Sequence, residues 1–416
     1  MNQQIKQRIK QIKNGEVPYG YKKIKIGIVP NEWEENKLKE VCINFIVPMR
    51  DKPKIFDGQI PWCRIEDAEG IYLNNSKTGQ YVSEKVVREM NLKIFPTGTV
   101  ICSCSASIGT YLINTKPLIT NQTFIGIVTG DRLKNFYLRY YMETQTNKLI
   151  MISNASTIPY ISREKFENMR ISLPPLEEQQ KIIDILSTQD KVIELKEKLL
   201  KEKEKQKKYL MQNLLTGRKR LKGFNGEWKK VKLKEYLMEI SERNKGLKIN
   251  NVLSVNNKLG FVKQEIQFGK TVASKDLSNY KIIKNNFIAY NPSRINVGSI
   301  AIYQGEVQGI VSPMYVVFKT NEMLDSNYFM FFVQSYEFFE KMKSLLSGSV
   351  RDSLNFSDLC NMQILLPSLE EQKAIAEILT TADKELKLLQ EELEEEKRKK
   401  KALMQLLLTG IVRVKV

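Results

Sequence analysis

Histidine is absent from the 416 residues of this sequence. Without an imidazole the chain cannot form a Ser-His or Cys-His nucleophilic pair, use the usual imidazole general base or bind zinc through histidine. The commonest catalytic arrangements are therefore excluded, and the composition argues against an enzyme.

Cysteine is also scarce. The five cysteines, Cys42, Cys63, Cys102, Cys104 and Cys360, are odd in number and irregularly spaced, unlike a secreted disulfide framework. We expect reduced thiols. Cys102 and Cys104 lie too close in sequence for a standard pair of zinc ligands, and no other cluster completes a set of four. Core thiols are the better interpretation, and no metal site is expected.

Long apolar runs and nucleotide-binding motifs are missing as well. No stretch reaches the 18 or more apolar residues of a membrane span, and the first residues lack the apolar core of a signal peptide, so we expect a cytoplasmic protein. There is no P-loop and no Gly-x-Gly-x-x-Gly turn. Asn291-Pro292 begins like an amino-methyltransferase motif, but Ser293 and Arg294 replace its second proline and aromatic residue.

Positive charge is abundant. The chain has 66 Lys and Arg against 47 Asp and Glu, a net charge of +19. Such an excess attracts polyanions, either nucleic acid or an anionic membrane surface. A basic protein without a polyanionic partner is the plainer alternative, so charge alone does not decide the function.

The sequence repeats itself. Leu173–Gln179 (LPPLEEQ) returns as Leu366–Gln372 (LPSLEEQ), and Leu214–Gly217 (LLTG) returns as Leu407–Gly410, both 193 positions later. Glu32-Trp33 recurs as Glu227-Trp228, 195 positions later. Each unit thus has about 140 variable residues followed by a closely matched segment. The two tryptophans are better explained as packing residues at the domain entrances than as platforms for stacked bases.

The matched segments, 176–215 and 369–408, are predicted to be long helices. Each follows a Leu-Pro pair, has two glutamates in its first turn and ends at Leu-Thr-Gly. A shared seven-residue spacing indicates a coiled-coil seam. It comprises Leu186, Ile193, Leu200, Lys207 and Leu214 in the first helix and Leu379, Leu386, Leu393, Lys400 and Leu407 in the second.

If these helices pack together, they must run antiparallel. About 40 residues of helix span roughly 60 Å, whereas a 140-residue domain is only about 35–40 Å across. The second helix therefore has to return along the first. Charge does not indicate a direction, because neither orientation gives clean complementarity, and the run from Glu391 to Lys401 is interpreted as a solvated face.

Together these motifs resemble the specificity subunits of type I restriction-modification systems over essentially the whole chain. Tyr290–Ile300 is also similar to a pattern that recurs in their recognition domains. The resemblance implies an α+β fold: two similar mixed α/β target recognition domains joined by two long helices that form an antiparallel coiled coil, with a pseudo-twofold internal repeat. The expected boundaries are 1–32 for a basic N-terminal arm, 33–172 and 218–365 for the two target recognition domains, 173–217 for the first helix, and 366–416 for the second helix and tail.

The family's function implies several partners. The chain would be non-catalytic and would read double-stranded DNA in two parts, one per domain. It would bind two copies of an adenine methyltransferase subunit and, for cleavage, restriction subunits that translocate DNA. S-adenosylmethionine, ATP and Mg²⁺ would belong to those partners, and none would be bound by this chain.

Polar loops are the candidate DNA contacts, because arginine grips a guanine edge, asparagine an adenine edge and lysine a phosphate. Gly98–Gly109, the first-domain counterpart of the Tyr290 segment, has no arginine, so its contact chemistry is less defined. The alternative for Arg294 and Arg351 is an internal salt bridge, with Asp352 available to Arg351. The candidates are Asn291, Ser293, Arg294, Asn296, Ser349 and Arg351; Ser103, Ser105, Ser107, Asn154, Ser156 and Thr157; and, more weakly, Lys52, Lys54, Lys270 and Lys275.

Two other functions stay open at this point. The chain could be a fused methyltransferase-specificity polypeptide, although the catalytic and cofactor motifs are missing. It could also be a coiled-coil scaffold that joins proteins without reading DNA.

Overall fold

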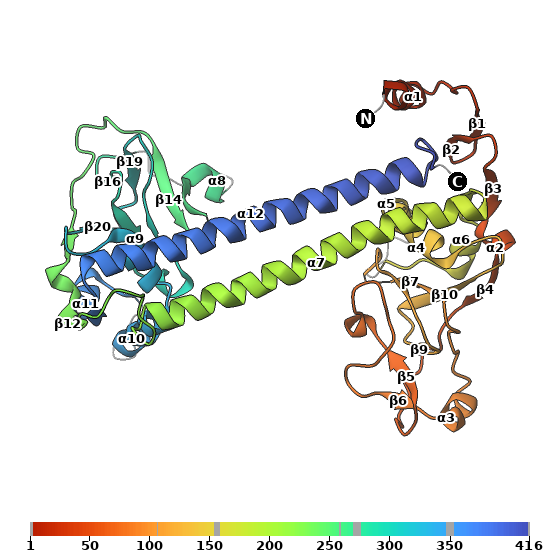
Figure 1. Ribbon diagram of the computed structural model, residues 1–416, viewed down its shortest axis with the longest axis horizontal. Helices are drawn as coiled ribbons and strands as arrows, with labels where there is room; N and C mark the ends of the chain where they lie inside the picture. The colour runs from red at the N-terminus through yellow and green to blue at the C-terminus, as the bar shows by residue number, and fades with distance from the viewer. Residues whose placement is uncertain are drawn as a thin grey trace. The chain divides into compact units, whose positions relative to one another are not determined.

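The computed structural model describes residues 3–105, 107–153, 159–257, 259–268, 276–346 and 353–414. These residues form two units. One unit holds the chain up to Lys196 together with the residues from Glu392 on, and the other holds Glu197–Glu391. Each unit therefore contains one repeated domain, one end of α7 (Leu176–Leu214) and the opposite end of α12 (Leu369–Leu407), as Figure 1 shows.

Each domain is built on a four-stranded antiparallel sheet, and the two sheets have the same strand order. In the first domain the order is β4 (Cys42–Ile46), β10 (Phe124–Thr129), β7 (Val100–Ser103) and β8 (Tyr111–Ile113). In the second it is β13 (Leu237–Glu239), β20 (Val316–Thr320), β17 (Ile288–Tyr290) and β18 (Ile300–Ile302). The internal repeat therefore extends through the variable regions, whose sequences do not reveal it.

A second sheet flanks the first in each domain and contains a parallel strand pair. In the first domain β5 (Ile60–Cys63) lies between β6 (Tyr81–Val82) and β9 (Ile119–Thr120). It pairs antiparallel with β6 and parallel with β9. In the second the order is β15 (Gly260–Lys263), β14 (Val252–Asn256), β19 (Gly309–Val311) and β16 (Lys281–Ile283), and β14 and β19 are parallel.

The two ends of each domain meet in a short antiparallel ribbon. β3 (Glu34–Lys37) pairs with β11 (Arg170–Leu173), and β12 (Lys229–Lys232) pairs with β21 (Gln363–Leu366). Because the second strand of each ribbon leads directly into a long helix, the ribbon fixes where that helix leaves its domain.

The remaining elements correspond in part: a short helical turn before each four-stranded sheet and three helices after β10 or β20 occur in both domains. In the first unit they are α1 (Gln3–Lys13), β1 (Tyr21–Ile24), β2 (Gly27–Pro30), α2 (Leu38–Val41), η1 (Ile65–Asp67), α3 (Glu84–Glu89), α4 (Asn135–Thr144), α5 (Thr146–Ile152) and α6 (Arg163–Glu167). In the second they are η2 (Leu233–Glu235), α8 (Gln264–Phe268), η3 (Ile295–Val297), α9 (Ser326–Phe332), α10 (Tyr336–Leu346) and α11 (Phe356–Asn361). The mixed α/β fold predicted for two similar domains is confirmed.

The long helices begin and end where the sequence predicts. Gln179 N–H donates to the Pro175 carbonyl at 2.9 Å, the first bond of α7, and Gln372 N–H does the same to Ser368 in α12. Past the helix ends, Gly217 and Gly410 have φ angles of 69° and 70°, which favour glycine. A Cβ on Gly410 would also lie 2.4 Å from Pro30 Cδ. Both the positive φ angle and this close approach therefore require glycine at position 410.

The predicted seam residues occupy the inner face of the helix pair. Leu186, Leu214, Leu379, Leu393 and Leu407 are buried. Ile193, Leu200 and Leu386 are half-buried. The outer seam positions also enter the domain cores, Leu186 and Leu407 in the first unit and Leu214 and Leu379 in the second. Each such leucine contributes about 1.5–3 kcal/mol by burial.

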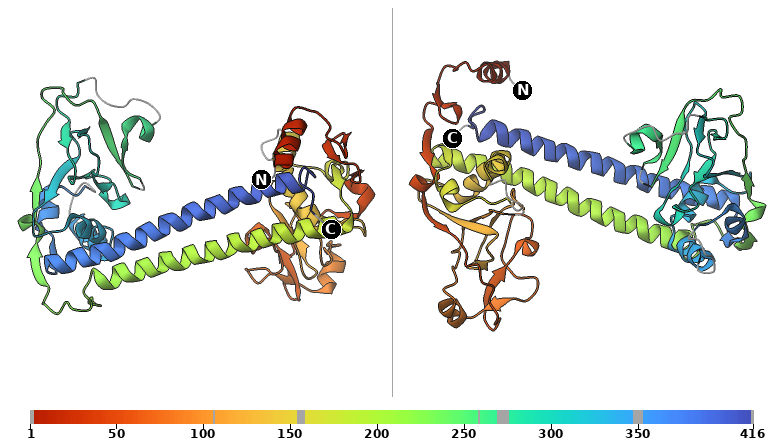
Figure 2. Two further views of the ribbon diagram at one scale, coloured as in Figure 1. Left: turned by 45° about the horizontal axis from the view of Figure 1, so that its top comes forward. Right: turned by 180° about the vertical axis from the view of Figure 1, so that it is seen from behind.

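Ion pairs show that α7 and α12 run antiparallel, as Figure 2 also shows within each unit. In the first unit Lys196 Nζ lies 2.7 Å from Glu392, and Gln189 Nε2 donates to Glu396 at 2.6 Å. In the second unit Lys203 Nζ lies 2.6 Å from Glu385. A higher number on α7 thus faces a lower number on α12.

These contacts correct one prediction. The sequence predicts a solvated face for the run from Glu391 to Lys401, but Glu392 and Glu396 contact α7. The charge pattern of the two helix sequences does not reveal these contacts, because complementary charges are confined to a few positions on each helix surface. Charge does indicate the antiparallel direction once those positions are known.

Candidate nucleic-acid interface

The connection between β17 and β18 presents polar side chains around a buried anchor. Ile295 is buried, while Ser293, Arg294 and Asn296 are exposed and Asn291 is half-buried. Asn291 Oδ1 accepts a hydrogen bond from Ser293 N–H at 3.1 Å, and the Asn291 carbonyl accepts from Arg294 N–H at 2.9 Å. These turn bonds hold the loop backbone, so the exposed side chains project from a defined support.

The Arg294 guanidinium is available for a ligand. It has no hydrogen-bond or ion-pair partner among the residues that the structure describes, so the internal salt bridge considered as its alternative role finds no support there. An exposed guanidinium can donate two parallel hydrogen bonds to one base edge or to a phosphate.

The hairpin between β7 and β8 is the first-domain counterpart. Ser103 N–H donates to the Thr110 carbonyl at 2.9 Å, just as Asn291 N–H donates to the Ser299 carbonyl at 3.1 Å. Ser103 itself is buried, and its hydroxyl donates to the Ser105 carbonyl at 3.0 Å. Ser103 therefore leaves the set of candidate contacts, whereas Ser105 is half-buried and Ser107 exposed.

The predicted lysines differ in their surroundings. Lys52 and Lys54 are both exposed, and Lys52 Nζ lies 5.7 Å from the centre of the Phe56 ring and 5.4 Å from that of Trp62. Seven further candidates lie outside the described residues: Asn154, Ser156, Thr157, Lys270, Lys275, Ser349 and Arg351.

The glutamates of the repeated motif attach each domain to a helix end. Glu178, 1% exposed, accepts from Trp33 Nε1 at 3.0 Å and from Arg413 at 2.7 and 2.9 Å. Glu371, 2% exposed, accepts from Trp228 Nε1 at 3.1 Å and from Arg220. Both tryptophans thus have the packing role predicted for them, and the buried carboxylates are compensated by charged donors.

The glutamine that follows has an equally specific role. Gln179 donates to the carbonyls of Arg132 and Pro174, both at 2.9 Å, and accepts from Lys134 N–H. Gln372 repeats this arrangement with Met323, Pro367 and Asp325. Each glutamine therefore holds the loop that leads into α4 or α9 against the start of the long helix.

The lysine shared by the two heptad patterns completes the attachment. Lys400 Nζ lies 2.8 Å from Asp190, 3.0 Å from Glu143 and 5.7 Å from the Tyr140 ring centre. In the second unit Lys207 pairs with Asp383 and lies 5.8 Å from the Phe331 ring centre. The lysine thus joins the two helices to each other and to α4 or α9, which a purely apolar seam could not do.

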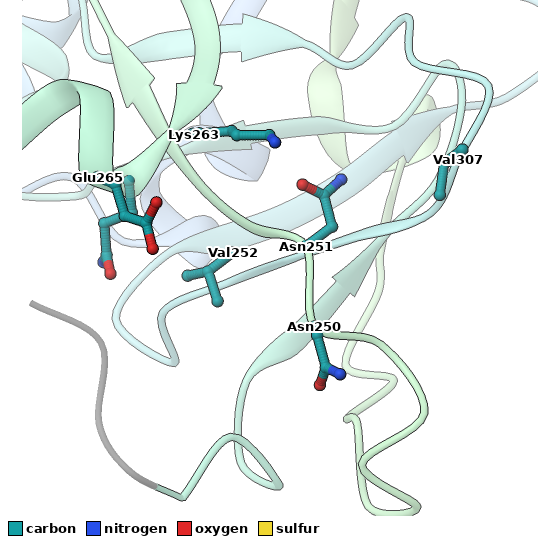
Figure 3. A pocket seen from close by; sticks show the side chains of 7 residues that line it. Asn250, Asn251, Val252, Lys263, Glu265 and Val307 are labelled. Atoms are coloured by element: carbon teal, nitrogen blue, oxygen red, sulfur yellow. The ribbon is translucent and has the colours of Figure 1, made fainter. Parts of the chain in front are cut away.

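One cavity of the second domain lies apart from these groups. It has a volume of about 460 Å³ and is lined by Asn250, Asn251, Val252, Lys263, Gln264, Glu265 and Val307, most of which Figure 3 labels. None of the residues singled out from the sequence lines it. Within the described ranges no group of three or more His, Cys, Asp or Glu side chains could hold a metal ion, and no helix has the length and apolarity to cross a membrane.

Cys102 and Cys104 lie in the core, as predicted for them. All five cysteines are free, and Cys63, Cys102 and Cys104 are buried. Burial raises the pKa of the Cys104 thiol to about 11 and that of Cys42 to about 12, so both are protonated near neutral pH.

Comparison with known proteins connects this architecture to one family. Residues 30–205 and 225–397 each match the family model described as "Type I restriction modification DNA specificity domain". The type I restriction enzyme MjaVIII specificity subunit of Methanocaldococcus jannaschii is 29% identical, over 93% of this chain and 94% of the relative. The MjaIX specificity subunit of the same organism is 34% identical over 183 residues, which is 42% of its length.

Two solved structures share the fold. The S subunit of a type I restriction-modification system from M. genitalium has a TM-score of 0.54 at 13% identity, over 92% of this chain and 97% of that one. A chain from a study of complex assembly and conformational transition of the type I R-M system has a TM-score of 0.56 at 18% identity, over 92% and 99%. At these identities the likeness establishes the fold alone.

Proposed function

Because the chain belongs to the type I restriction modification DNA specificity domain family, we propose that it reads a two-part DNA sequence with one domain for each part. The observation that carries this proposal is the repeat itself. Two domains with the same sheet order each present a hairpin at the same place, yet the exposed residues of the two hairpins differ. Two hairpins on equivalent sheets but with different exposed residues are expected if each domain recognises a different DNA sequence.

The proposed domain boundaries are 33–172 and 218–365, with the arm at 1–32 and the helical segments at 173–217 and 366–416. Homologous chains are specificity subunits, which do not catalyse, and we propose the same for this chain. Its partners would be double-stranded DNA, two methyltransferase subunits and restriction subunits. S-adenosylmethionine, ATP and Mg²⁺ would be bound by those partners.

The proposed contacts to bases or phosphates are Asn291, Ser293, Arg294 and Asn296 in the second domain and Ser105 and Ser107 in the first. Lys52 and Lys54 are proposed as weaker phosphate contacts. The excess of positive charge supports a polyanionic partner, since phosphate contacts provide most of the affinity for DNA.

Mapping of methylated adenines tests the proposal. DNA exposed to the chain reconstituted with its methyltransferase subunits should carry methyl groups within a single two-part consensus. Exchange of residues 33–172 for the equivalent domain of a relative should then change one half of that consensus and leave the other intact. Simultaneous change of both halves would rule out one reader per half.

The same material separates the alternatives. A fused methyltransferase would bind S-adenosylmethionine as the purified chain alone, which we do not expect. A scaffold that does not read DNA would give no consensus in the presence of its partners.

A further inference from the structure

The two hairpins differ in one chemical group. The second-domain hairpin carries the exposed Arg294, whereas residues 104–110 of the first-domain hairpin include neither arginine nor lysine. If both domains read base pairs, the first must obtain a strong hydrogen-bond donor from another segment, because a serine hydroxyl makes a single, weaker contact.

A neighbouring segment lies along each hairpin in the same way. Ile161 N–H donates to the Cys104 carbonyl at 2.8 Å in the first domain, and Leu354 N–H donates to the Pro292 carbonyl at 3.1 Å in the second. The preceding residue is Tyr160 in the first domain and Ser353 in the second. Tyr160 forms a backbone bridge with Ser105 and is 40% exposed, so its backbone is held beside the hairpin.

Arg50 leaves the sheet at the end from which the hairpin projects. β4 and β7 both pair antiparallel with β10, with Ile46 and Ile101 opposite Gly126 on its two sides, so the two strands run in the same direction. Arg50 follows β4, its side chain is exposed, and it has no hydrogen-bond or ion-pair partner in the described part of the chain. Burial raises the pKa of Tyr160, and the positive charge of Arg50 acts in the opposite direction, which agrees with this placement. Lys52, two residues on, is instead held over Phe56 and Trp62.

We propose that Arg50, which follows β4 at the hairpin end of the sheet, supplies the base-reading guanidinium that the first-domain hairpin lacks. The inference rests on the proposed function and names one specificity-determining residue within it. The expected target is a guanine, since guanidinium donates two hydrogen bonds to the O6 and N7 atoms of that base. The two domains then read with arginines from different loops of one fold, Arg50 after β4 and Arg294 between β17 and β18.

Selection of binding sites from a randomised DNA pool tests this. The full chain, in complex with its methyltransferase subunits, should select a two-part consensus. The Arg50→Ala variant should lose the preference for one G·C pair by about 5- to 150-fold, in one half only. Arg50→Lys should weaken this preference while keeping overall affinity, because an ammonium group lacks the planar, rigid fork of a guanidinium.

The matched control is Arg88→Ala. Arg88 is an exposed arginine of the same domain whose guanidinium lies 3.8 Å from Glu84, so its removal should leave the consensus unchanged. Arg50→Gln gives a second variant should Arg50→Ala fold poorly, and it should show the same loss. Tyr160→Phe should keep the G·C preference if Arg50 alone reads the base.

Three outcomes would overturn the inference. An unchanged consensus for Arg50→Ala and Arg50→Gln would remove Arg50 from the reader. Equal weakening on selected and random DNA, restored by Arg50→Lys, would assign Arg50 to a phosphate. A relaxed preference in both halves would contradict its place in the first domain. A wild-type complex that selects no consensus would instead refute the proposed function.

Discussion

Arg413 forms a bidentate ion pair with Glu178, 235 positions earlier in the chain, with Nε and Nη2 at 2.7 and 2.9 Å from the carboxylate oxygens. Arg220 and Glu371 form the same pair in the second unit. In both, the glutamate begins one long helix and the arginine follows the end of the other. The first domain is therefore completed by the segment after α12, and the second by the segment after α7.

Replacement of Arg413 by alanine should destabilise the first unit. Glu178 would stay buried with only the Trp33 indole as a donor, and removal of one partner of a buried pair costs about 2–4 kcal/mol when the partner is partly exposed, as Arg413 is. Denaturant unfolding of the full chain measures the loss. Arg398→Ala, an exposed arginine of α12, is the control, and an equal effect of both variants would contradict the role of the pair.

The cysteines should differ in reactivity. Burial raises the pKa of Cys104 to about 11 from an ordinary 9.0, so the folded state holds the proton more tightly than the unfolded state. Its contribution to stability is complete below pH 9 and is lost as the pH rises through about 11. At pH 8 we expect iodoacetamide to modify the half-exposed Cys360 first and the buried Cys102 last.

Mass spectrometry of the modified peptides reports this order. Denaturant should equalise the rates, which shows that burial sets them. Modification of Cys102 or Cys104 as fast as that of Cys360 in the folded protein would contradict the core role of these thiols.

The helices, their ends and the seam were predictable because their signals are local. A seven-residue spacing, a Leu-Pro entrance and a Leu-Thr-Gly exit each specify structure within a few turns of helix. The repeat also indicates the side chains that attach each domain to the long helices. Glu178 and Glu371, Gln179 and Gln372, and Lys207 and Lys400 each lie 193 positions apart. Arg220 and Arg413 are also 193 positions apart, so the repeat could have identified this pair as well.

Other features were not readable in this way. The partners of these side chains come from distant segments, so Asp190 opposite Lys400 or Trp33 opposite Glu178 follows only from the packed structure. The burial of Ser103 depends on its place in β7, next to β8 and β10. The common strand order of the two domains is hidden because side chains in sheets diverge while the backbone pairing persists.

Arg294→Ala should weaken binding to the specific DNA by about 1–3 kcal/mol if its guanidinium reads a base edge. The side chain is exposed and has no partner among the described residues, so its loss should not affect folding. Binding of the complex to target and random DNA at several salt concentrations distinguishes the possible roles. Equal losses on both DNAs would assign Arg294 to a phosphate, and unchanged binding would exclude a contact.

The proposed function makes the length of the helix pair a candidate determinant of the spacing between the two half-sites. α7 and α12 have 39 residues each, and their ion pairs fix the antiparallel register. Insertion of seven residues between Lys196 and Lys203, with seven more between Leu389 and Lys397, keeps the heptad phase. It lengthens each helix by about 10 Å, and the half-sites should then lie about three base pairs farther apart.

Four-residue insertions at the same positions are the informative comparison. They shift the heptad phase, turn one seam relative to the other, and should impair binding rather than lengthen the spacer. Methylation mapping of the reconstituted complexes gives the spacing directly. If the seven-residue variant folds, binds its partners and still methylates sites with the original spacing, helix length does not set the spacer, and the flexibility of the DNA or of the domain attachments must absorb the difference.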